Sequence, residues 1–182
     1  MGDPEQRHWN TTVGHAVSTD LIGWSVLPDA IRPGAPGDWD DYTAWTGSVI
    51  EVEGRWAMLY TGTSRSEDGL IQRIGLAWSD DLVDWEKAPF NPILEHDASR
   101  YEALDRSIWP DQAWRDPWVF IDPTDGRFHV LLTARVQEGP AGERGVVAHA
   151  VSDDLRRWTV LDPVTDPGAF GHLEIPQLVE AN

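Results

Sequence analysis

The sequence contains no cysteine, so disulfide bonds and thiolate metal sites are excluded and cysteine usage indicates no redox compartment. Basic side chains are scarce: 14 Lys and Arg stand against 31 Asp and Glu, and the net charge of -17 disfavours nucleic acid and anionic membranes as partners. No run approaches the roughly 18 apolar residues of a membrane-spanning helix, and no apolar leader follows the polar N-terminus. We therefore expect a soluble chain whose cellular compartment the sequence does not determine, with the cytoplasm slightly favoured.

Several residue patterns of common enzyme classes are also missing. The six histidines show no His-x-His or His-x-x-x-His spacing, which argues against a zinc site. There is no glycine-rich phosphate loop and no Gly-x-Ser-x-Gly segment, so nucleotide cofactors and serine-based hydrolysis have no support. We expect a protein that uses no cofactor and no metal.

One segment that is present occurs three times. Residues 16–24, 77–85 and 150–158 all follow the pattern Ala-x-Ser-x-Asp-Leu-x-x-Trp. The copies start at intervals of 61 residues (16 to 77) and 73 residues (77 to 150). A supersecondary unit repeated at such intervals must stack its copies to bury a core. The repeat therefore indicates a domain of stacked units.

Short β-prone runs separated by turns precede the second and third copies of the repeat. Each unit has three such runs, and a fourth strand is expected after the final tryptophan. Four antiparallel strands per unit are typical of a β-propeller blade, and a propeller closes with about 4 to 8 blades. The fold class is therefore all-β, with no long helix. The expected strands cover residues 45–52, 55–61, 72–79, 114–121, 127–133 and 145–151.

The chain as printed is expected to form a single, incomplete propeller domain over residues 1–182. Its predicted parts are the outer part of a first blade at 14–30, a second blade at 45–90, a third at 114–162 and the start of a fourth at 172–182. An incomplete propeller exposes unpaired strand edges, which favour self-association.

Candidate chemistry lies where the innermost strands begin, because those strands line the central channel of a propeller. They open with Trp45-Thr-Gly-Ser48, Trp114-Arg-Asp-Pro117 and Leu173-Glu-Ile-Pro176. The last two place a carboxylate, Asp116 or Glu174, close to a proline. Carboxylates brought together from separate blades can divide the roles of acid, base and nucleophile. That arrangement is the one that glycoside hydrolysis requires.

Four segments resemble motifs of glycoside hydrolase family 32, which comprises invertases, inulinases and related β-fructosidases. The family's Trp-Gly-His-Ala-x-Ser-x-Asp-Leu-x-x-Trp segment is similar to residues 13–24, and its Ser-Gly-Ser segment to residues 45–48. Its Arg-Asp-Pro motif is intact at residues 115–117, and its Glu-Cys-Pro motif resembles residues 174–176, with Ile175 in place of the cysteine. The motifs occur in the family's order, and the resemblance implies a propeller of five blades.

The resemblance also implies roles for individual residues. Asp116 would be the transition-state stabiliser that holds sugar hydroxyls, and Glu174 the general acid and base, while Arg115 would shape the pocket. The family's nucleophile is an aspartate in a Trp-x-Asn-Asp-Pro-Asn segment, whose strand is expected before Met1. Because Asp3-Pro4 copies only a dipeptide of that segment, the chain as printed is expected to lack the nucleophile.

Further residues are candidates for substrate binding. Trp45 and Trp114 open channel-lining strands, where an aromatic face suits stacking against a sugar ring. Trp39 and Asp40 lie in an acidic loop just before and are predicted to form a pocket rim, with a solvated loop as the alternative. Ser48 is a candidate contact or a small residue required for packing.

Alternative functions remain open at this point. The alternative role of Asp116 and Arg115 is a structural ion pair with each other. The alternative for Glu174 is likewise a purely structural role. The replacement of the family's cysteine by Ile175 also leaves open an inverting glycosidase of the family 43 type. We predict a hydrolase of β-fructosides or another small glycoside, and the alternative from a different class is a carbohydrate-binding or structural propeller module without turnover.

Overall fold

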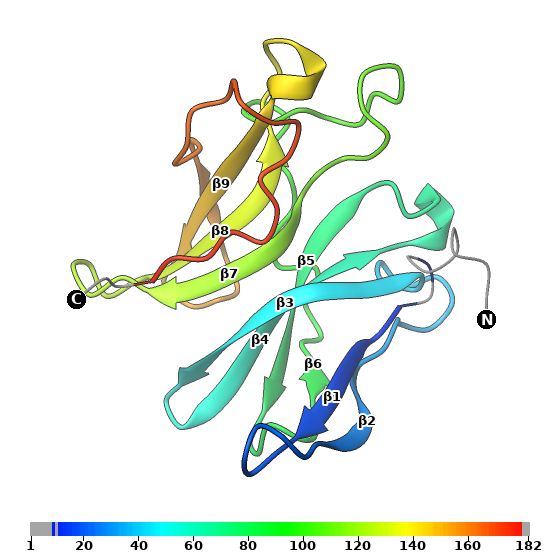
Figure 1. Cartoon of the computed structure of the whole chain (residues 1–182), viewed down its shortest axis with the longest axis vertical. Helices are drawn as coiled ribbons and strands as arrows, with labels where there is room; N and C mark the ends of the chain where they lie inside the picture. Colours follow the sequence, from blue (N-terminus) through cyan, green and yellow to red (C-terminus); the bar gives the residue numbers. More distant parts are fainter. Residues whose placement is uncertain (1–8, 10, 180–182) are drawn as a thin grey trace.

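The computed structural model describes residue 9 and residues 11–179 of the 182-residue chain. Strands dominate this part of the chain (Figure 1), and its only helical elements are the 3-10 turns η2 (Arg65–Glu67) and η3 (Ala141–Glu143). The structure therefore confirms the predicted all-β class. No helix in the described residues is long and apolar enough to cross a membrane.

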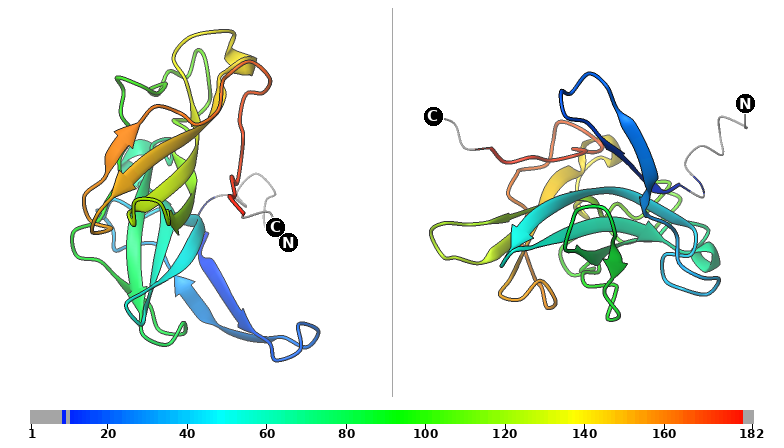
Figure 2. Two further views of the ribbon diagram at one scale, coloured as in Figure 1. Left: turned by 90° about the vertical axis from the view of Figure 1, so that its left-hand side faces the viewer. Right: turned by 90° about the horizontal axis from the view of Figure 1, so that it is seen from below.

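The strands form three antiparallel sheets, and within each sheet the strands follow chain order. Two sheets have four strands and one has two, and they lie side by side without closing into a ring (Figures 1 and 2). The two-stranded sheet contains β1 (Val13–Val17) and β2 (Ser25–Ile31). The first four-stranded sheet contains β3 (Thr43–Val52), β4 (Arg55–Thr63), β5 (Gln72–Ser79) and β6 (Glu86–Lys87). The second contains β7 (Arg115–Ile121), β8 (Phe128–Arg135), β9 (Gly145–Ser152) and β10 (Thr159–Leu161).

The repeated segment forms the turn between the last two strands of each sheet. In the third copy, Asp154 Oδ1 accepts hydrogen bonds from the backbone N–H groups of Arg156 (2.9 Å) and Arg157 (2.8 Å), and Ser152 Oγ accepts one from the Asp154 N–H (3.2 Å). These backbone hydrogen bonds hold the pKa of Asp154 below its usual range. The leucine that follows adopts a left-handed conformation in every copy, with φ of 60° at Leu21, 64° at Leu82 and 59° at Leu155. The repeated sequence therefore encodes a side-chain-capped turn.

The three leucines differ in burial, and this difference predicts effects of glycine of different size at two of them. Leu155 is 1 % exposed and Leu82 is 37 % exposed. Glycine relieves a left-handed strain of roughly 1–2 kcal/mol but loses roughly 0.5–1 kcal/mol more chain entropy on folding. We expect Leu82→Gly to change the free energy of unfolding by less than about 1 kcal/mol, and Leu155→Gly to lower it by about 2–4 kcal/mol through the lost side chain. Urea unfolding of both variants checks this, and equal losses would contradict it.

The main hydrophobic core lies between the two four-stranded sheets. It combines side chains of β4 and β5 with those of β8 and β9, and the long loop between β6 and β7 adds Tyr101 and Trp114, both fully buried. The ring centroids of these two aromatics are 5.2 Å apart. Because each sheet buries one face here, the core fixes the angle at which the sheets meet.

Residues 172–179, predicted as the first strand of a further blade, form no strand in the structure, and 180–182 lie outside the described residues. The chain from 170 to 175, here named the strap, instead crosses from β9 over β8 to β7 (Figure 1). An innermost strand needs a second strand of its own blade to pair with, and the described residues offer none to this segment.

Side chains and one backbone group hold the strap where strand pairing is missing. The Gly145 N–H donates to the Phe170 carbonyl (2.8 Å), and Arg135 Nη1 donates to the Gly171 carbonyl (2.6 Å). Arg135 is 1 % exposed and stands 3.6 Å from the centroid of the Trp109 ring. A buried arginine in β8 therefore anchors the strap over the second sheet.

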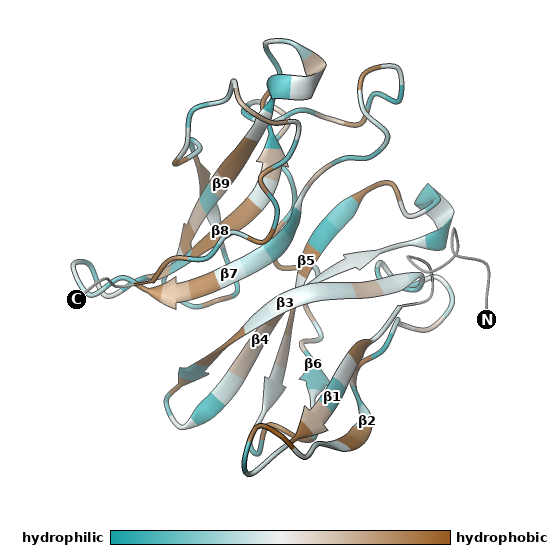
Figure 3. Ribbon diagram, in the orientation of Figure 1, coloured by the Kyte–Doolittle hydropathy of each residue, from teal (hydrophilic) through white to brown (hydrophobic). Residues whose placement is uncertain are grey.

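The hairpin of β1 and β2 projects away from the other sheets (Figure 2) and carries apolar residues near its tip (Figure 3). Leu21, Ile22 and Val26 are 78 %, 87 % and 85 % exposed. Contiguous apolar surface of this kind marks an interaction site more often than isolated apolar residues do.

A histidine pair in the second sheet predicts that stability depends on pH. His129 Nδ1 and His149 Nε2 are 2.9 Å apart, and His129 Nε2 lies 3.1 Å from Asp125 Oδ2. Burial, and then the charge of His129, lower the pKa of His149. Because the folded state disfavours the charged form, the contribution of His149 is complete above the unfolded pKa of about 6.5 and is lost as the pH falls below it. We expect the free energy of unfolding to decrease as the pH is lowered from about 7.5 to about 5.5.

Replacing His149 by Gln is expected to make this pH dependence shallower. It would not remove the dependence, because burial also lowers the pKa of His96 and of His172. Urea titrations at several pH values measure the slope in both proteins. An identical slope in the variant would show that the pair contributes nothing to it.

Candidate active site

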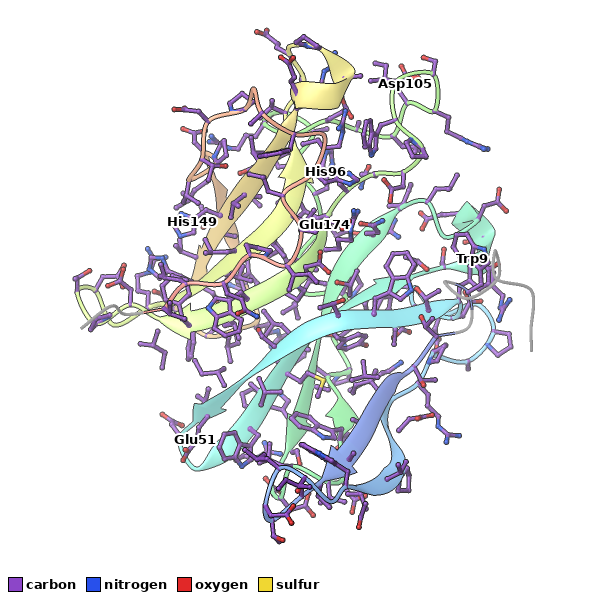
Figure 4. All side chains as sticks on the ribbon, viewed as in Figure 1. Trp9, Glu51, His96, Asp105, His149 and Glu174 are labelled. Carbon is purple, nitrogen blue, oxygen red and sulfur yellow. The ribbon has the colours of Figure 1, made fainter. Side chains whose placement is uncertain are left out.

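A hollow of about 740 Å³ opens where the first strands of the two four-stranded sheets, β3 and β7, approach the strap. Four residues predicted from the sequence line it: Trp45, Arg115, Asp116 and Glu174. Figure 4 shows Glu174 near the junction of the two sheets. The structure thus brings both predicted catalytic carboxylates to one cavity.

Asp116 reaches the hollow because β7 is irregular at this point. The pairing of β7 with β8 shifts register between Arg115 and Trp118, and Asp116 itself has a φ of 57°. A bulge of this kind redirects a side chain, and left-handed backbone at a non-glycine residue persists only where its surroundings hold it. The Asp116 N–H donates to Thr61 Oγ1 (3.1 Å), and Asp116 Oδ2 accepts from Thr133 Oγ1 (2.9 Å). The carboxylate is thereby held at a residue exposure of 6 %.

Glu174 is the more exposed of the two carboxylates, with a side-chain exposure of 56 %. Its Oε1 accepts a hydrogen bond from Arg115 Nη2 (2.5 Å). This bond is the main reason why the pKa of Glu174 lies below its usual range. In this arrangement Glu174 is a carboxylate, the form that acts as a base.

Arg115 links several groups around the hollow. Besides Glu174, its guanidinium donates to Gln72 Oε1 (3.1 Å) and Asp111 Oδ2 (3.4 Å), and Nη2 lies 3.1 Å from His172 Nδ1. Its Nε lies 3.7 Å from Asp116 Oδ2. Its planar donors therefore fix the Glu174 carboxylate relative to β7, and the guanidinium forms an ion pair with Asp116.

Among the residues that line the hollow, sequence reasoning missed Asp111 and Trp9. Asp111 Oδ2 accepts from Gln72 Nε2 (2.8 Å), while Asp111 Oδ1 is buried without a hydrogen-bond partner. Trp9 stacks on Tyr42, with ring centroids 5.0 Å apart. The spacing of Asp111 four residues before Arg115 was a weak signal for an ion pair, whereas nothing around Trp9 distinguished it from the other tryptophans.

Four predicted binding residues do not line the hollow. Trp114 is fully buried in the core, and Ser48 Oγ accepts a hydrogen bond from the Val119 N–H (2.9 Å) inside the sheet packing. Trp39 packs on Tyr60, with ring centroids 5.8 Å apart. The structure thus places Trp114, Ser48 and Trp39 outside the lining of the hollow that contains Asp116 and Glu174.

The fourth is Asp40, which is 2 % exposed and accepts hydrogen bonds from Tyr60 Oη (2.8 Å) and Lys87 Nζ (2.5 Å). These bonds satisfy a carboxylate inside the first sheet rather than at a pocket rim. The hydrogen-bond partners of Asp40 are therefore structural ones and do not belong to the hollow.

Register explains why Trp45 lies at the hollow and Trp114 does not. Trp45 pairs with Thr61 and Arg115 pairs with Thr133 at corresponding positions of the two sheets. Trp114 therefore corresponds to the residue before Trp45. A shift of one residue moves a side chain to the opposite face of a sheet, so Trp114, predicted to bind substrate, is buried in the core and does not line the hollow.

Comparison with known proteins identifies the family. The model of the N-terminal domain of glycosyl hydrolases family 32 matches residues 3–182. The chain belongs to glycoside hydrolase family 32. The predicted resemblance to this family is thereby confirmed.

Relatives within family 32 include a fructan 6-exohydrolase of Beta vulgaris, 30 % identical over 156 residues that cover 82 % of this chain. Another is an insoluble β-fructofuranosidase isoenzyme of Arabidopsis thaliana, 36 % identical over 154 residues that also cover 82 % of the chain. In both cases the match covers 24 % of the relative. The chain therefore spans about a quarter of the length of these family 32 proteins.

Among solved family 32 structures, fructan 1-exohydrolase IIa of Cichorium intybus matches 92 % of this chain and 29 % of its own, with a TM-score of 0.72 and 28 % identity. A variant of that enzyme in complex with 1-kestose matches with a TM-score of 0.71 and 27 % identity over the same shares. The likeness confirms the predicted β-propeller type of fold, which the described sheets form in part.

Proposed function

We propose that the hollow is part of a site that hydrolyses β-fructosides. The observation that carries the proposal is that Asp116 of β7 and Glu174 of the strap line one cavity beside Arg115. Membership of family 32 supports this chemistry, since relatives of the chain are a fructan exohydrolase and a β-fructofuranosidase. The substrate class of the proposal is a small carbohydrate with a terminal fructosyl unit.

The two carboxylates have different environments, which suits them to different roles. Asp116 is buried, and Thr133 and the Ile175 N–H both donate to its Oδ2. A carboxylate fixed in this way can accept hydrogen bonds from sugar hydroxyls without reorganising, which is how charge in a transition state is stabilised. Glu174 is exposed to the hollow and can reach a glycosidic oxygen or a water. We assign Asp116 the stabilising role and Glu174 the acid and base role.

The acid role of Glu174 sets a condition on the complete site. A general acid must carry a proton when the glycosidic bond breaks, whereas Arg115 holds the pKa of Glu174 below its usual range. Protonation therefore requires that substrate displaces the Arg115 bond or that a further negative charge stands close by. The nucleophilic carboxylate of a retaining site, about 5 to 5.5 Å from the acid, would supply such a charge. The proposal assigns the nucleophile to no described residue.

Binding and turnover by the purified chain test the proposal. Tryptophan fluorescence reports on the hollow because Trp9 and Trp45 line it, and sucrose and 1-kestose are the ligands, with maltose as the non-fructosyl control. We expect saturable binding of sucrose and 1-kestose but not of maltose. We expect release of fructose from a protein preparation that contains the nucleophile. Absence of fructoside binding would contradict the proposed function.

Fructoside binding without fructose release, in a preparation that contains the nucleophile, would favour the second candidate, a carbohydrate-binding module. The observation behind this candidate is the Arg115 bond, which keeps Glu174 ionised.

We also propose that copies associate through the apolar tip of the β1–β2 hairpin, because Leu21, Ile22 and Val26 are exposed there. Sedimentation velocity on the same samples tests this, with concentration-dependent association as the expected result.

A further inference from the structure

We propose that Thr133 is a positioning residue that orients the Asp116 carboxylate and sets its distance from the Glu174 backbone. This inference rests on the proposed function for its effect on catalysis, but its structural part stands on contacts within the chain. Thr133 lies in β8, is fully buried, and touches both segments that carry the candidate carboxylates.

The Thr133 hydroxyl stands at the junction of β7 and the strap. Its Oγ1 lies 2.9 Å from Asp116 Oδ2 and 3.1 Å from the Leu173 carbonyl oxygen, and both are acceptors. A hydroxyl has one proton to donate, and a bond to a carboxylate is the stronger of the two choices. The Ile175 N–H donates to the same Asp116 Oδ2 (3.3 Å). Thr133 and Ile175 thus hold one carboxylate oxygen from two sides, and Glu174 lies between the two strap residues that make these contacts.

The internal repeat shows that this threonine has a counterpart with a complementary task. Trp56 pairs with Ser79 as Phe128 pairs with Ser152, so the two sheets align at these positions. Thr61 and Thr133 follow Trp56 and Phe128 by the same number of residues and are equivalent. Thr61 Oγ1 accepts from the Asp116 N–H (3.1 Å) and lies 3.1 Å from the Thr46 carbonyl, to which it donates.

The two equivalent threonines therefore hold different parts of the same aspartate. Thr61 fixes the backbone of Asp116, and Thr133 fixes its carboxylate. The φ of 57° at Asp116 costs a non-glycine residue roughly 1–3 kcal/mol and must be held by neighbours, which is the task of the Thr61 bond to the Asp116 N–H. Removal of the Thr133 hydroxyl would leave the backbone in place and free the carboxylate to rotate.

Three replacements of Thr133 and one control separate this role from simple packing. Thr133→Val and Thr133→Ala remove the hydroxyl, and Thr133→Ser retains it. Thr63→Val is the matched control, because Thr63 is an equally buried threonine in β4 whose hydroxyl bonds only to Thr43 Oγ1 (2.6 Å) in the described structure. Alanine leaves room for a water and serves as the second test should valine prevent folding.

The first measurement does not depend on activity. Isoleucine-selective amide labelling places an NMR signal on Ile175, whose N–H donates to Asp116 Oδ2. We expect this signal to shift in the Val and Ala variants and to return close to its original position in the Ser variant. Thr63→Val should leave it unchanged. An Ile175 signal that stays in place when the hydroxyl is removed would overturn the proposal.

The second measurement uses a preparation that releases fructose from sucrose. We expect Thr133→Val to lower kcat by about 10- to 100-fold and to change KM by less than about threefold. The reason is that loss of a hydrogen bond to the charged carboxylate weakens stabilisation of the transition state more than binding of the substrate. Thr133→Ser should recover most of kcat. An unchanged kcat would overturn the catalytic part of the proposal. If the unmodified protein binds no fructoside, the proposed function fails, and the Ile175 signal still decides the position of Asp116.

Discussion

Replacing Glu174 by Gln is expected to reduce fructose release by about 10²- to 10⁴-fold, the usual contribution of a general acid–base catalyst. Glutamine keeps the size of the side chain and can still accept a hydrogen bond from Arg115, but it can neither donate a proton to the leaving oxygen nor remove one from water. The loss should therefore fall on kcat, while fructoside affinity measured by tryptophan fluorescence stays within a few fold.

Glu95→Gln is the matched control for this experiment. Glu95 also accepts a bond from an arginine, Arg73 Nε at 2.8 Å, but its side chain is 62 % exposed and lies outside the hollow. We expect its rate of fructose release to equal that of the unmodified protein. Equal rates for Glu174→Gln and Glu95→Gln would remove Glu174 from the mechanism.

The largest expected loss of stability comes from Glu102→Gln. Glu102 Oε1 accepts from Arg135 Nε (2.7 Å), Glu102 Oε2 accepts from Arg144, and the side chains of Glu102 and Arg135 are 8 % and 1 % exposed. Breaking one partner of a buried ion pair leaves the other charge uncompensated, which typically costs 3–5 kcal/mol. We expect a loss of about 3–5 kcal/mol in the free energy of unfolding, measured by urea denaturation.

An exposed ion pair at the edge of the second sheet, between the residue before β8 and the residue after β9, provides the comparison. Arg127 Nε lies 2.8 Å from Asp153 Oδ1, and the two side chains are 38 % and 81 % exposed. Asp153→Asn is expected to cost less than about 1 kcal/mol, because water already solvates both charges. A loss for Glu102→Gln no larger than that for Asp153→Asn would mean that Arg135 does not depend on Glu102.

The strands were predictable because the information that places them is local. Each copy of the repeat contains the serine and aspartate that cap its own turn, as Ser79 and Asp81 do between β5 and β6. The alternation of apolar residues before each turn then defines the flanking strands. Asp116 and Glu174 were predictable for a different reason, namely that their motifs resemble those of family 32.

The rest of the site was not predictable because it depends on contacts distant in sequence. The bulge at Asp116 rests on Thr61 and Thr133, which belong to two different sheets. The burial of Trp114 follows from a register shift of one residue, which no local pattern records. Asp111 enters the hollow from a loop without periodicity, through bonds to Gln72 and Arg115.

The different supports of the two carboxylates have a consequence for how the site assembles. Asp116 belongs to a strand in a four-stranded ladder, whereas Glu174 stands on the strap, which has no ladder of its own. Segments without strand pairing open locally at a lower free energy than the sheets beneath them. The strap can therefore open while β7 stays folded, and the fraction of molecules with both carboxylates in place follows that local equilibrium. A sugar that bridges Asp116 and Glu174 would favour the closed form and so complete the site that binds it.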